Sequence, residues 1–160
     1  MKILKCQKYC CVIKVKPYIP QKKYYINKNK KKAGVFFIDN KTNKILLVQS
    51  RGNLWGPPKG SLNIKESVKE CALREVFEET GIVIKKEDLN EYTIVKGNST
   101  YFLMEIDENE VFIQKNMNEN INDANGITWI NINCLNKEIL LRNMNITCHC
   151  KILLNKYFSI

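Results

Sequence analysis

The sequence predicts an α/β protein in which helices cover both sides of a central sheet, forming an α/β/α sandwich. Three observations predict this fold. Two apolar runs flank a polar turn at residues 40–43, as in a β-hairpin. An amphipathic segment within residues 60–82 has the spacing of a helix that packs on a sheet. Short apolar runs and a final stretch with helical spacing follow, and this order of elements is typical of a layered α/β fold.

The first 50 residues are expected to contribute strands and one long loop. Residues 9–16 are predicted to form a strand, and residues 17–32 a Lys-rich loop that either contacts phosphates or is simply solvated. Residues 33–39 and 44–50 are predicted to pair as the hairpin. Because no linker divides the chain, residues 1–32 are expected to belong to the same domain as residues 33–160.

The residues after position 81 are expected to complete the sheet and to close the fold. Residues 115–126 read as a polar loop, and the apolar spacing over residues 137–158 predicts one or two helices. The predicted strands cover residues 82–84, 92–96, 100–106, 111–114 and 127–132.

The segment over residues 60–82 carries the clearest chemistry. In a helix, Glu75, Glu78 and Glu79 would share one face, because they are three and four residues apart. Three carboxylates on one face repel one another, and divalent cations that prefer oxygen ligands would relieve that repulsion. Gly81 is placed where a helix commonly ends in the left-handed conformation. The opposite face is apolar and contains Val68, Ala72, Leu73, Val76 and Phe77.

The same segment resembles the Nudix box at every fixed position. Gly60 is followed by five residues and Glu66, then by seven residues and the run REVFEETGI over residues 74–82. The resemblance implies the Nudix fold, in which a mixed sheet carries the box helix. It also implies an acid anhydride hydrolase that uses Mg²⁺ or Mn²⁺ to cleave a nucleoside diphosphate linked to another group.

The resemblance assigns roles to the residues of the box. Glu78 and Glu79 correspond to metal ligands, and Glu75 to a further ligand or to the catalytic base. Arg74 would orient the glutamates through a salt bridge, with Glu66 as its partner. The backbone carbonyl of Lys59 or Gly60 would complete the metal coordination.

The loop LWGPPKG before the box offers three candidates for substrate binding. Trp55 reads either as an aromatic residue that anchors the loop or as a wall of the pocket. The Lys59 ammonium would meet a substrate phosphate or neutralise the nearby carboxylates. Arg51 lies in the turn that leads into the loop.

A further acidic catalytic residue is expected in the polar loop before the last predicted strand. Many Nudix enzymes use such a residue, and decapping members often carry a Glu six residues before a Trp. Counting back from Trp129 gives Asp123, whose side chain is one methylene shorter than Glu. Glu119 is the alternative in the same loop, and neither residue need be catalytic.

The flanking residues suggest a substrate. WGPPKG and CALREVFEETG resemble mRNA-decapping Nudix enzymes, although Pro57-Pro58 departs from the usual WGFPKG. The double proline also resembles diadenosine tetraphosphate hydrolases, which usually carry His where this chain has Ser61. Decapping is therefore the first expectation. Hydrolysis of dinucleoside polyphosphates, nucleotides or diphosphoinositol polyphosphates is the second, and a non-catalytic RNA- or nucleotide-binding module is the third.

Composition bounds the partners and the compartment. The formal net charge of +10 is typical of proteins with polyanionic partners such as RNA, nucleotides or anionic membranes. Nearly all the positive charge is Lys and Asn is abundant, which an AT-rich genome, such as that of a large DNA virus, would also produce. No apolar run is long enough to span a membrane, and the N-terminus does not resemble a signal peptide. A cytoplasmic protein with reduced thiols is expected.

Seven cysteines raise the question of a second metal site. Cys6, Cys10 and Cys11 lie near one end of the sequence, and Cys148, His149 and Cys150 near the other. If the termini met, these residues would offer thiolate and imidazole ligands to zinc. Their spacing matches no standard zinc motif, so idle or buried free thiols are the default expectation, and Cys71 reads as a core residue.

Overall fold

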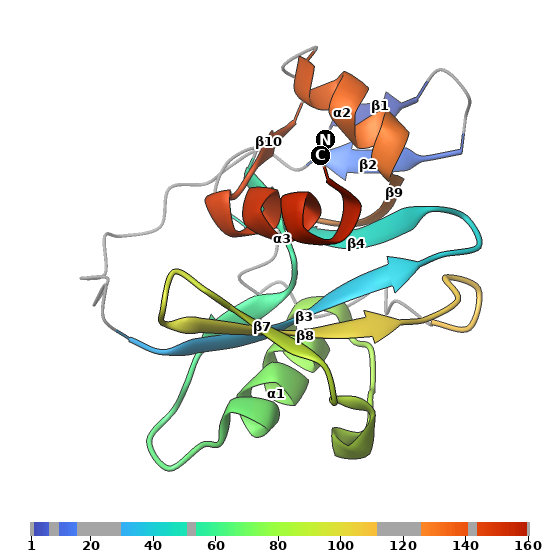
Figure 1. Cartoon of the computed structure of the whole chain (residues 1–160). Helices are drawn as coiled ribbons and strands as arrows, with labels where there is room; N and C mark the ends of the chain where they lie inside the picture. The colour runs from blue at the N-terminus through green and yellow to red at the C-terminus, as the bar shows by residue number, and fades with distance from the viewer. Residues whose placement is uncertain are drawn as a thin grey trace.

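The computed structural model of the chain describes residues 2–6, 10–15, 30–50, 54–111, 126–140 and 144–159. Figure 1 shows a central sheet with helix α1 (Val68–Thr80) on one side and helices α2 (Ile132–Leu140) and α3 (Cys148–Phe158) on the other. The predicted α/β/α sandwich is therefore confirmed. No helix among the described residues is long and apolar enough to cross a membrane.

The main sheet is mixed, as the resemblance implied. Its strands run in the spatial order β10, β5, β4, β3, β8 and β7, with β6 added beside β3 and β9 beside β4. The β3–β8 and β5–β10 pairs are parallel, and the remaining pairs of this sheet are antiparallel. The bounds are β3 (Lys32–Asp39), β4 (Lys44–Gln49), β5 (Leu54–Gly56), β6 (Lys59–Ser61), β7 (Tyr92–Val95), β8 (Ser99–Glu105), β9 (Gly126–Asn131) and β10 (Asn145–Ile146).

A separate two-stranded sheet lies beside the main one. Strands β1 (Lys2–Lys5) and β2 (Val12–Val15) pair antiparallel with each other. Strand β2 lies against β9, where the Thr128 hydroxyl donates to the carbonyl of Val12 at 3.3 Å. Ile13 is buried in the core on that side of the main sheet.

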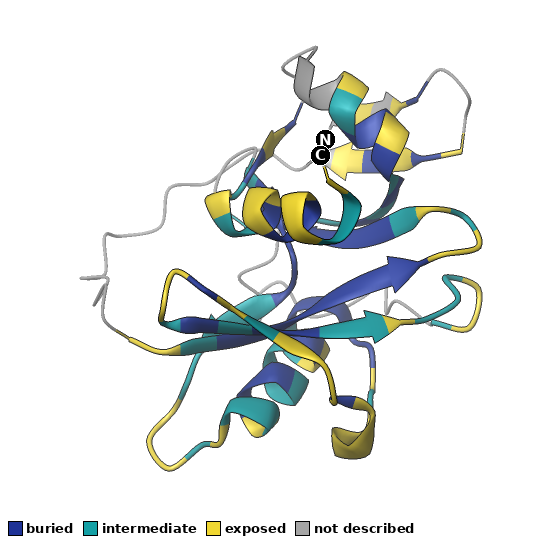
Figure 2. Ribbon diagram, in the orientation of Figure 1, coloured by how far each residue is buried: buried dark blue, intermediate teal, exposed yellow. Residues whose placement is uncertain are grey.

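The two-residue period of β3 and β4 explains why the sheet is covered on both faces. Val35, Phe37 and Leu46 are buried with the apolar face of α1. Their neighbours Phe36 and Leu47 point to the other face and are buried with residues of α2 and α3. Figure 2 shows the resulting band of buried residues along the central strands. Both strands therefore read as nearly continuous apolar runs.

Helix α1 is closed at both ends by local hydrogen bonds. The Ser67 side chain accepts from the N–H of Glu70, and the Glu70 carboxylate accepts from the N–H of Ser67 in return, which is a capping box. Gly81 has φ 74° and donates its N–H to the carbonyl of Phe77 at 2.8 Å. The helical end predicted at Gly81 is therefore confirmed.

Several expected boundaries were wrong. The segment LWGPPKG, expected as a loop, contains β5 and β6, which gain their hydrogen bonds from β4 and β3. Residues 82–84 form no strand, because the Thr80 hydroxyl turns the chain by accepting the N–H of Ile82. Helix α2 begins at Ile132, directly after β9, rather than near residue 137. The short helix η1 (Lys86–Asp88) and strands β1 and β10 were not expected. Residues 112–125, which include most of a predicted strand and loop, lie outside the described residues.

Asp39 ties the β3–β4 turn to the turn after β8. Its buried carboxylate accepts the N–H of Lys41 at 2.8 Å, of Thr42 at 3.1 Å and of Glu108 at 3.0 Å. Burial alone would raise the pKa of Asp39, but these N–H donors outweigh it and hold the pKa below its ordinary value.

Asp39→Ala should lower the free energy of unfolding by about 2 kcal/mol, because three backbone N–H groups lose their acceptor. Urea denaturation followed by circular dichroism would measure the change. Lys41→Ala removes an exposed ion pair with Asp107 and should lower the free energy of unfolding much less. Equal losses in the two variants would contradict the role given to Asp39.

Candidate active site

The candidate site is built from helix α1 and the chain segment that precedes it. Cys71, Ala72 and Val76 are buried against the sheet and so fix the rotation of α1. This rotation turns the glutamates toward strand β6, which is held by its pairing with the start of β3. Figure 1 shows α1 packed below the sheet.

Arg74 lies at the centre of the carboxylates. Its Nε and Nη2 donate to the two oxygens of Glu66 at 2.7 and 2.9 Å, which is a bidentate pair. Its Nη1 donates to Glu75 at 2.7 Å and to Glu78 at 2.9 Å, and Nη2 also donates to the carbonyl of Ser61 at 3.1 Å. The predicted pairing of Arg74 with Glu66 and with the glutamates of the box is confirmed. Their catalytic roles stay predictions.

The Arg74 guanidinium changes the acidity of its neighbours. Its hydrogen bonds to Glu66 lower the pKa of that carboxyl to about 2, despite an opposing effect of burial. Glu75 behaves differently, because burial raises its pKa above the ordinary value and the contact with Arg74 offsets this only in part. Glu66 is therefore held as a carboxylate, while Glu75 is a stronger base than an exposed glutamate.

Gly60 leaves the space that the Glu75 carboxylate occupies. A Cβ atom added at Gly60 would lie 1.9–2.0 Å from the carboxylate atoms of Glu75. A second close approach brings Gly34 of β3 against the carbonyl of Pro58, which would lie 2.2 Å from an added Cβ. Glycine at these two positions lets β6 lie close both to its partner strand β3 and to the acidic face of α1.

Glu79 and Glu78 lie in different surroundings. Glu79 is nearly buried, and its carboxylate accepts the backbone N–H of Lys59 at 2.8 Å. The Glu78 side chain is 38% exposed, so among the three glutamates of the box its carboxylate is the most accessible to solvent. Glu79 therefore connects α1 to the loop that ends at Lys59, and Glu78 faces outward.

The chemistry of these donors fits a hard divalent cation. Three carboxylates and the carbonyl of Gly60 are oxygen ligands of the kind that Mg²⁺ and Mn²⁺ prefer. The Gly60 carbonyl accepts a weak hydrogen bond from the Cys71 thiol at 3.7 Å, which places it beside the acidic face of α1. In the described structure, Glu75 and Glu78 are drawn together by Arg74, a cation already at this face.

The remaining predicted residues divide into two groups. Trp55 is fully buried in the core on the α3 side of the sheet, so the interpretation as a wall of the substrate pocket was wrong and the packing interpretation is correct. Its carbonyl accepts the N–H of Thr147, which joins β5 to β10. Arg51, Glu119 and Asp123 lie outside the described residues.

One contact near the site was not predicted from the sequence. The Tyr101 hydroxyl of β8 lies 2.9 Å from Nδ1 of His149, in the first turn of α3. The two rings pack edge to face with centroids 5.8 Å apart. The only signal in the sequence was that His149 is the sole histidine, and nothing connected it with Tyr101.

The charges of three lysines act on this histidine. Burial lowers the pKa of His149 to about 4, and the charges of Lys59, Lys32 and Lys96 act in the same direction. The Lys59 ammonium also acts on Glu75, where it opposes the rise in pKa. The charges of these three residues, the lysine group, all act on His149, and that of Lys59 acts on Glu75 as well, so an anionic substrate would be attracted here.

Comparison of the chain with known proteins identifies its family. The model of the NUDIX domain matches residues 28–143. A protein of Invertebrate iridescent virus 3 named "Putative hydrolase 111R" is 33% identical over 158 residues, which cover 91% of this chain and 88% of the relative.

Other relatives match over shorter stretches. The m7GpppN-mRNA hydrolase dcap-2 of Caenorhabditis elegans is 43% identical over 51 residues, 30% of this chain and 6% of that protein. The asymmetrical bis(5'-nucleosyl)-tetraphosphatase of Mus musculus is 40% identical over 62 residues, 38% of this chain and 39% of that protein. These two matches leave most of each relative uncovered.

A solved structure supports the fold. The bifunctional NMN adenylyltransferase/ADP ribose pyrophosphatase of Francisella tularensis, in complex with AMP and a manganese ion, superimposes with a TM-score of 0.59. The match covers 81% of this chain and 41% of that chain, at 23% sequence identity.

Gly60→Ala should reduce hydrolysis about 10²-fold, because the new methyl group displaces the Glu75 carboxylate. Stability should change little, since the clashing atoms belong to the end of a flexible side chain. Steady-state kinetics and urea denaturation would separate the two effects. The control Ser61→Ala keeps the carbonyl that Arg74 uses and should retain activity. Full activity of Gly60→Ala would contradict the close packing described here.

The Glu66–Arg74 pair should make stability depend on pH between about 4.5 and 2. The folded pKa of Glu66 lies below the unfolded value of 4.5, so its contribution is complete above pH 4.5 and is lost as the pH falls toward 2. Urea denaturation at several pH values should show a smaller slope in this window for Glu66→Gln than for the wild type. The variant should also be less stable at pH 7, by about 2 kcal/mol. Parallel curves would show that Glu66 does not titrate in this way.

Proposed function

Because this chain belongs to the Nudix family, we propose that it is a metal-dependent hydrolase that removes the 5′ cap of mRNA and releases a methylated nucleoside diphosphate. Hydrolysis of a pyrophosphate bond is the reaction of the family and of this chain. The choice of a capped RNA is the proposal. The observation that carries it is the 43% identity over 51 residues to an m7GpppN-mRNA hydrolase.

Two properties of the chain support a capped RNA as the substrate. Lys59 of the lysine group acts on Glu75 of the acidic face of α1, and a substrate with several phosphates requires such positive charge near the site. The net charge of +10 would extend this attraction to the RNA backbone beyond the cap. A cap substrate would also place the enzyme in the cytoplasm, and in that of the host if the protein is viral, as its relative 111R is.

We assign each residue of the site a role in this reaction. Glu78, Glu79 and the Gly60 carbonyl would hold the divalent cation, with Glu75 as a further ligand or as the base that takes a proton from water. The raised pKa of Glu75 suits a base. Mg²⁺ or Mn²⁺, when bound, supplies charge neutralisation on the phosphate oxygens and a water of lowered pKa.

The neighbouring side chains would orient these groups and the substrate. Arg74 fixes the positions of Glu75 and Glu78, and Glu66 fixes Arg74. The Lys59 ammonium would bind a substrate phosphate. Asp123 and Glu119 stay proposed alternatives for the base, since both lie in the segment before β9.

A second candidate function is hydrolysis of a small molecule. The 40% identity to a bis(5'-nucleosyl)-tetraphosphatase over 62 residues favours a dinucleoside polyphosphate. The lysine group would serve such a substrate equally well, because it too carries a row of phosphates. The expectation of a non-catalytic binding module has no comparable support. The box of this chain retains Arg74 and the three glutamates, which binding alone would not need.

Hydrolysis of cap-labelled RNA with Mg²⁺ or Mn²⁺ would test the proposal, beside free cap analogue, diadenosine tetraphosphate and a diphosphoinositol polyphosphate. Release of methylated GDP from RNA is expected, and Glu78→Gln should lower the rate by about 10²-fold or more. Glu87→Gln, which changes an exposed glutamate of η1, is the matched control. Turnover of the small molecules with RNA left intact would refute decapping and favour the second candidate.

A further inference from the structure

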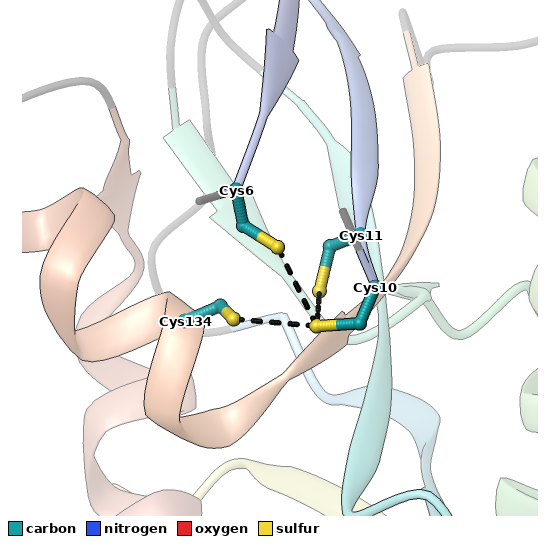
Figure 3. A group of neighbouring side chains, drawn as sticks. All are labelled: Cys6, Cys10, Cys11 and Cys134. Atoms are coloured by element: carbon teal, nitrogen blue, oxygen red, sulfur yellow. Dashed lines mark hydrogen bonds between the residues drawn. The ribbon is translucent and has the colours of Figure 1, made fainter. Parts of the chain in front are cut away.

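Four cysteine thiols meet at one point of the fold, three from residues 6–11 and one from residue 134. Cys6 follows β1, Cys10 and Cys11 precede β2, and Cys134 lies in the first turn of α2. The Cys10 sulfur is 3.4 Å from that of Cys6 and 3.6 Å from those of Cys11 and Cys134. Figure 3 shows the four side chains pointing toward one another from the hairpin and from α2.

The spacing of the four sulfurs is that of a tetrahedral thiolate site. All four lie within 4.8 Å of one another. Four sulfurs at about 2.3 Å from one Zn²⁺ are separated from one another by about 3.8 Å, the edge of the tetrahedron. The three separations from the Cys10 sulfur are slightly shorter, so small rotations of the side chains would admit the ion. Iron–sulfur clusters hold some of their thiolates on different irons and need a wider arrangement.

Disulfide bonds account for this arrangement less well. A disulfide joins two sulfurs at about 2.05 Å, and all four cysteines are free thiols in the structure. The Cys10 sulfur lies close to the sulfurs of the three other cysteines, and a disulfide could join it to only one of them. A shared cation at the centre satisfies all four sulfurs at once.

Backbone groups around the cluster support thiolates. The N–H of Asn131 donates to the Cys11 sulfur at 3.2 Å, and an N–H donor of this kind stabilises a negatively charged sulfur. The N–H of Cys6 donates to the carbonyl of Cys11 at 3.3 Å and draws the ends of the intervening loop together. Cys6, Cys11 and Cys134 are buried, and Cys10 is exposed, so an ion has a route of entry.

We propose that Cys6, Cys10, Cys11 and Cys134 bind one structural zinc ion. Thiolates are soft ligands, which select Zn²⁺ over Mg²⁺ and Mn²⁺. Each thiol releases its proton to solvent as the metal–sulfur bond forms, and no electron is transferred. Four protein ligands leave no open position for water or substrate, so the ion stabilises the structure and takes no part in hydrolysis.

The ligand set differs from the one considered from the sequence. The C-terminal residues do not join the cluster. His149 bonds to Tyr101, Cys150 is buried in the core, and Cys148 is exposed in the first turn of α3. Cys134 supplies the fourth ligand instead, because α2 begins directly after β9 and β2 lies beside that strand.

The zinc site lies at the other end of the sheet from the carboxylates. Asn131, beside the cluster, pairs with Lys44, which pairs with Asp39 at the end of β3. Gly60 pairs with Ala33 near the start of β3. Asp39 and Ala33 are six residues apart, which corresponds to about 20 Å along a strand. The two metal sites are thus independent.

The consequence for the fold is a crosslink between the β1–β2 hairpin and α2. The hairpin forms a sheet of its own and precedes residues 28–143, which match the NUDIX domain, whereas Cys134 lies within them. A two-stranded hairpin is marginally stable by itself. A zinc ion that binds three thiolates from the hairpin and one from α2 would hold it against β9.

The metal content of the purified full-length chain would test the proposal. Protein made without a metal-binding tag should retain about one zinc per chain after dialysis, and X-ray absorption should show four sulfurs at about 2.3 Å. Cobalt-substituted protein should show the thiolate-to-metal absorption of a tetrahedral site. These measurements use the wild type, so they do not depend on whether a variant folds.

Two matched cysteine variants locate the site. Cys134→Ser should lower the affinity for zinc about tenfold or more, whereas Cys148→Ser, outside the cluster, should bind zinc as the wild type does. Wild-type protein that holds no zinc, or zinc bound only through oxygen and nitrogen, would overturn the proposal. So would a mass lower by two hydrogens for each disulfide formed among the four cysteines. None of these results depends on which substrate is hydrolysed.

Discussion

The Arg74 guanidinium holds the acidic face of α1 together. Glu75 and Glu78 lie on neighbouring turns of one helix, where two carboxylates repel each other and weaken the helix. Arg74 bonds to both, and Glu66 holds the guanidinium in place by a bidentate pair from outside the helix. The same cation therefore offsets the repulsion and fixes where the carboxylates point. A metal ion approaching this face meets carboxylates whose directions are already set, so little ordering remains to be done on binding.

The sheet provides the second constraint, because it brings two loops and one helix to the same place. Gly34 and Gly60 lack side chains where β3, β6 and α1 approach one another most closely. Glu79 then bonds to the backbone of Lys59, so the helix and the loop hold each other. On the far side of β3, β8 brings Tyr101 to His149, and the charge of Lys59 acts both on His149 and on Glu75. Positive charge that would attract anions and carboxylates that would bind cations thus lie together near the start of β3, as hydrolysis of a phosphate anhydride requires.

The parts of the fold that could be predicted are those specified by local sequence. The β3–β4 hairpin and helix α1 have clear apolar periods, and Gly81 marks the end of the helix. Strand β6 was missed, because Lys59–Ser61 has no apolar period and owes its extended form to pairing with β3. The start of α2 was missed, because Ile132 continues the apolar run of β9. The four glutamates and Arg74 were found through their spacing in sequence, whereas the contact between Tyr101 and His149 depends on how α3 packs and has no local signal.

The proposed zinc site also depends on a contact that the local sequence does not reveal. Its ligands explain how one chain could use two metals. Cys134 is 124 residues from Cys10, so only the packing of β2 against β9 brings them together. The two sites differ in the hardness of their ligands, since one offers carboxylate and carbonyl oxygens and the other offers thiolates. A cell supplies Mg²⁺ in excess over zinc, and oxygen ligands that still hold water exchange Mg²⁺ readily during turnover. Four thiolates enclose zinc completely and keep it. The chemistry of the ligands alone would therefore direct a readily exchanged ion to the reaction and a permanent one to the hairpin.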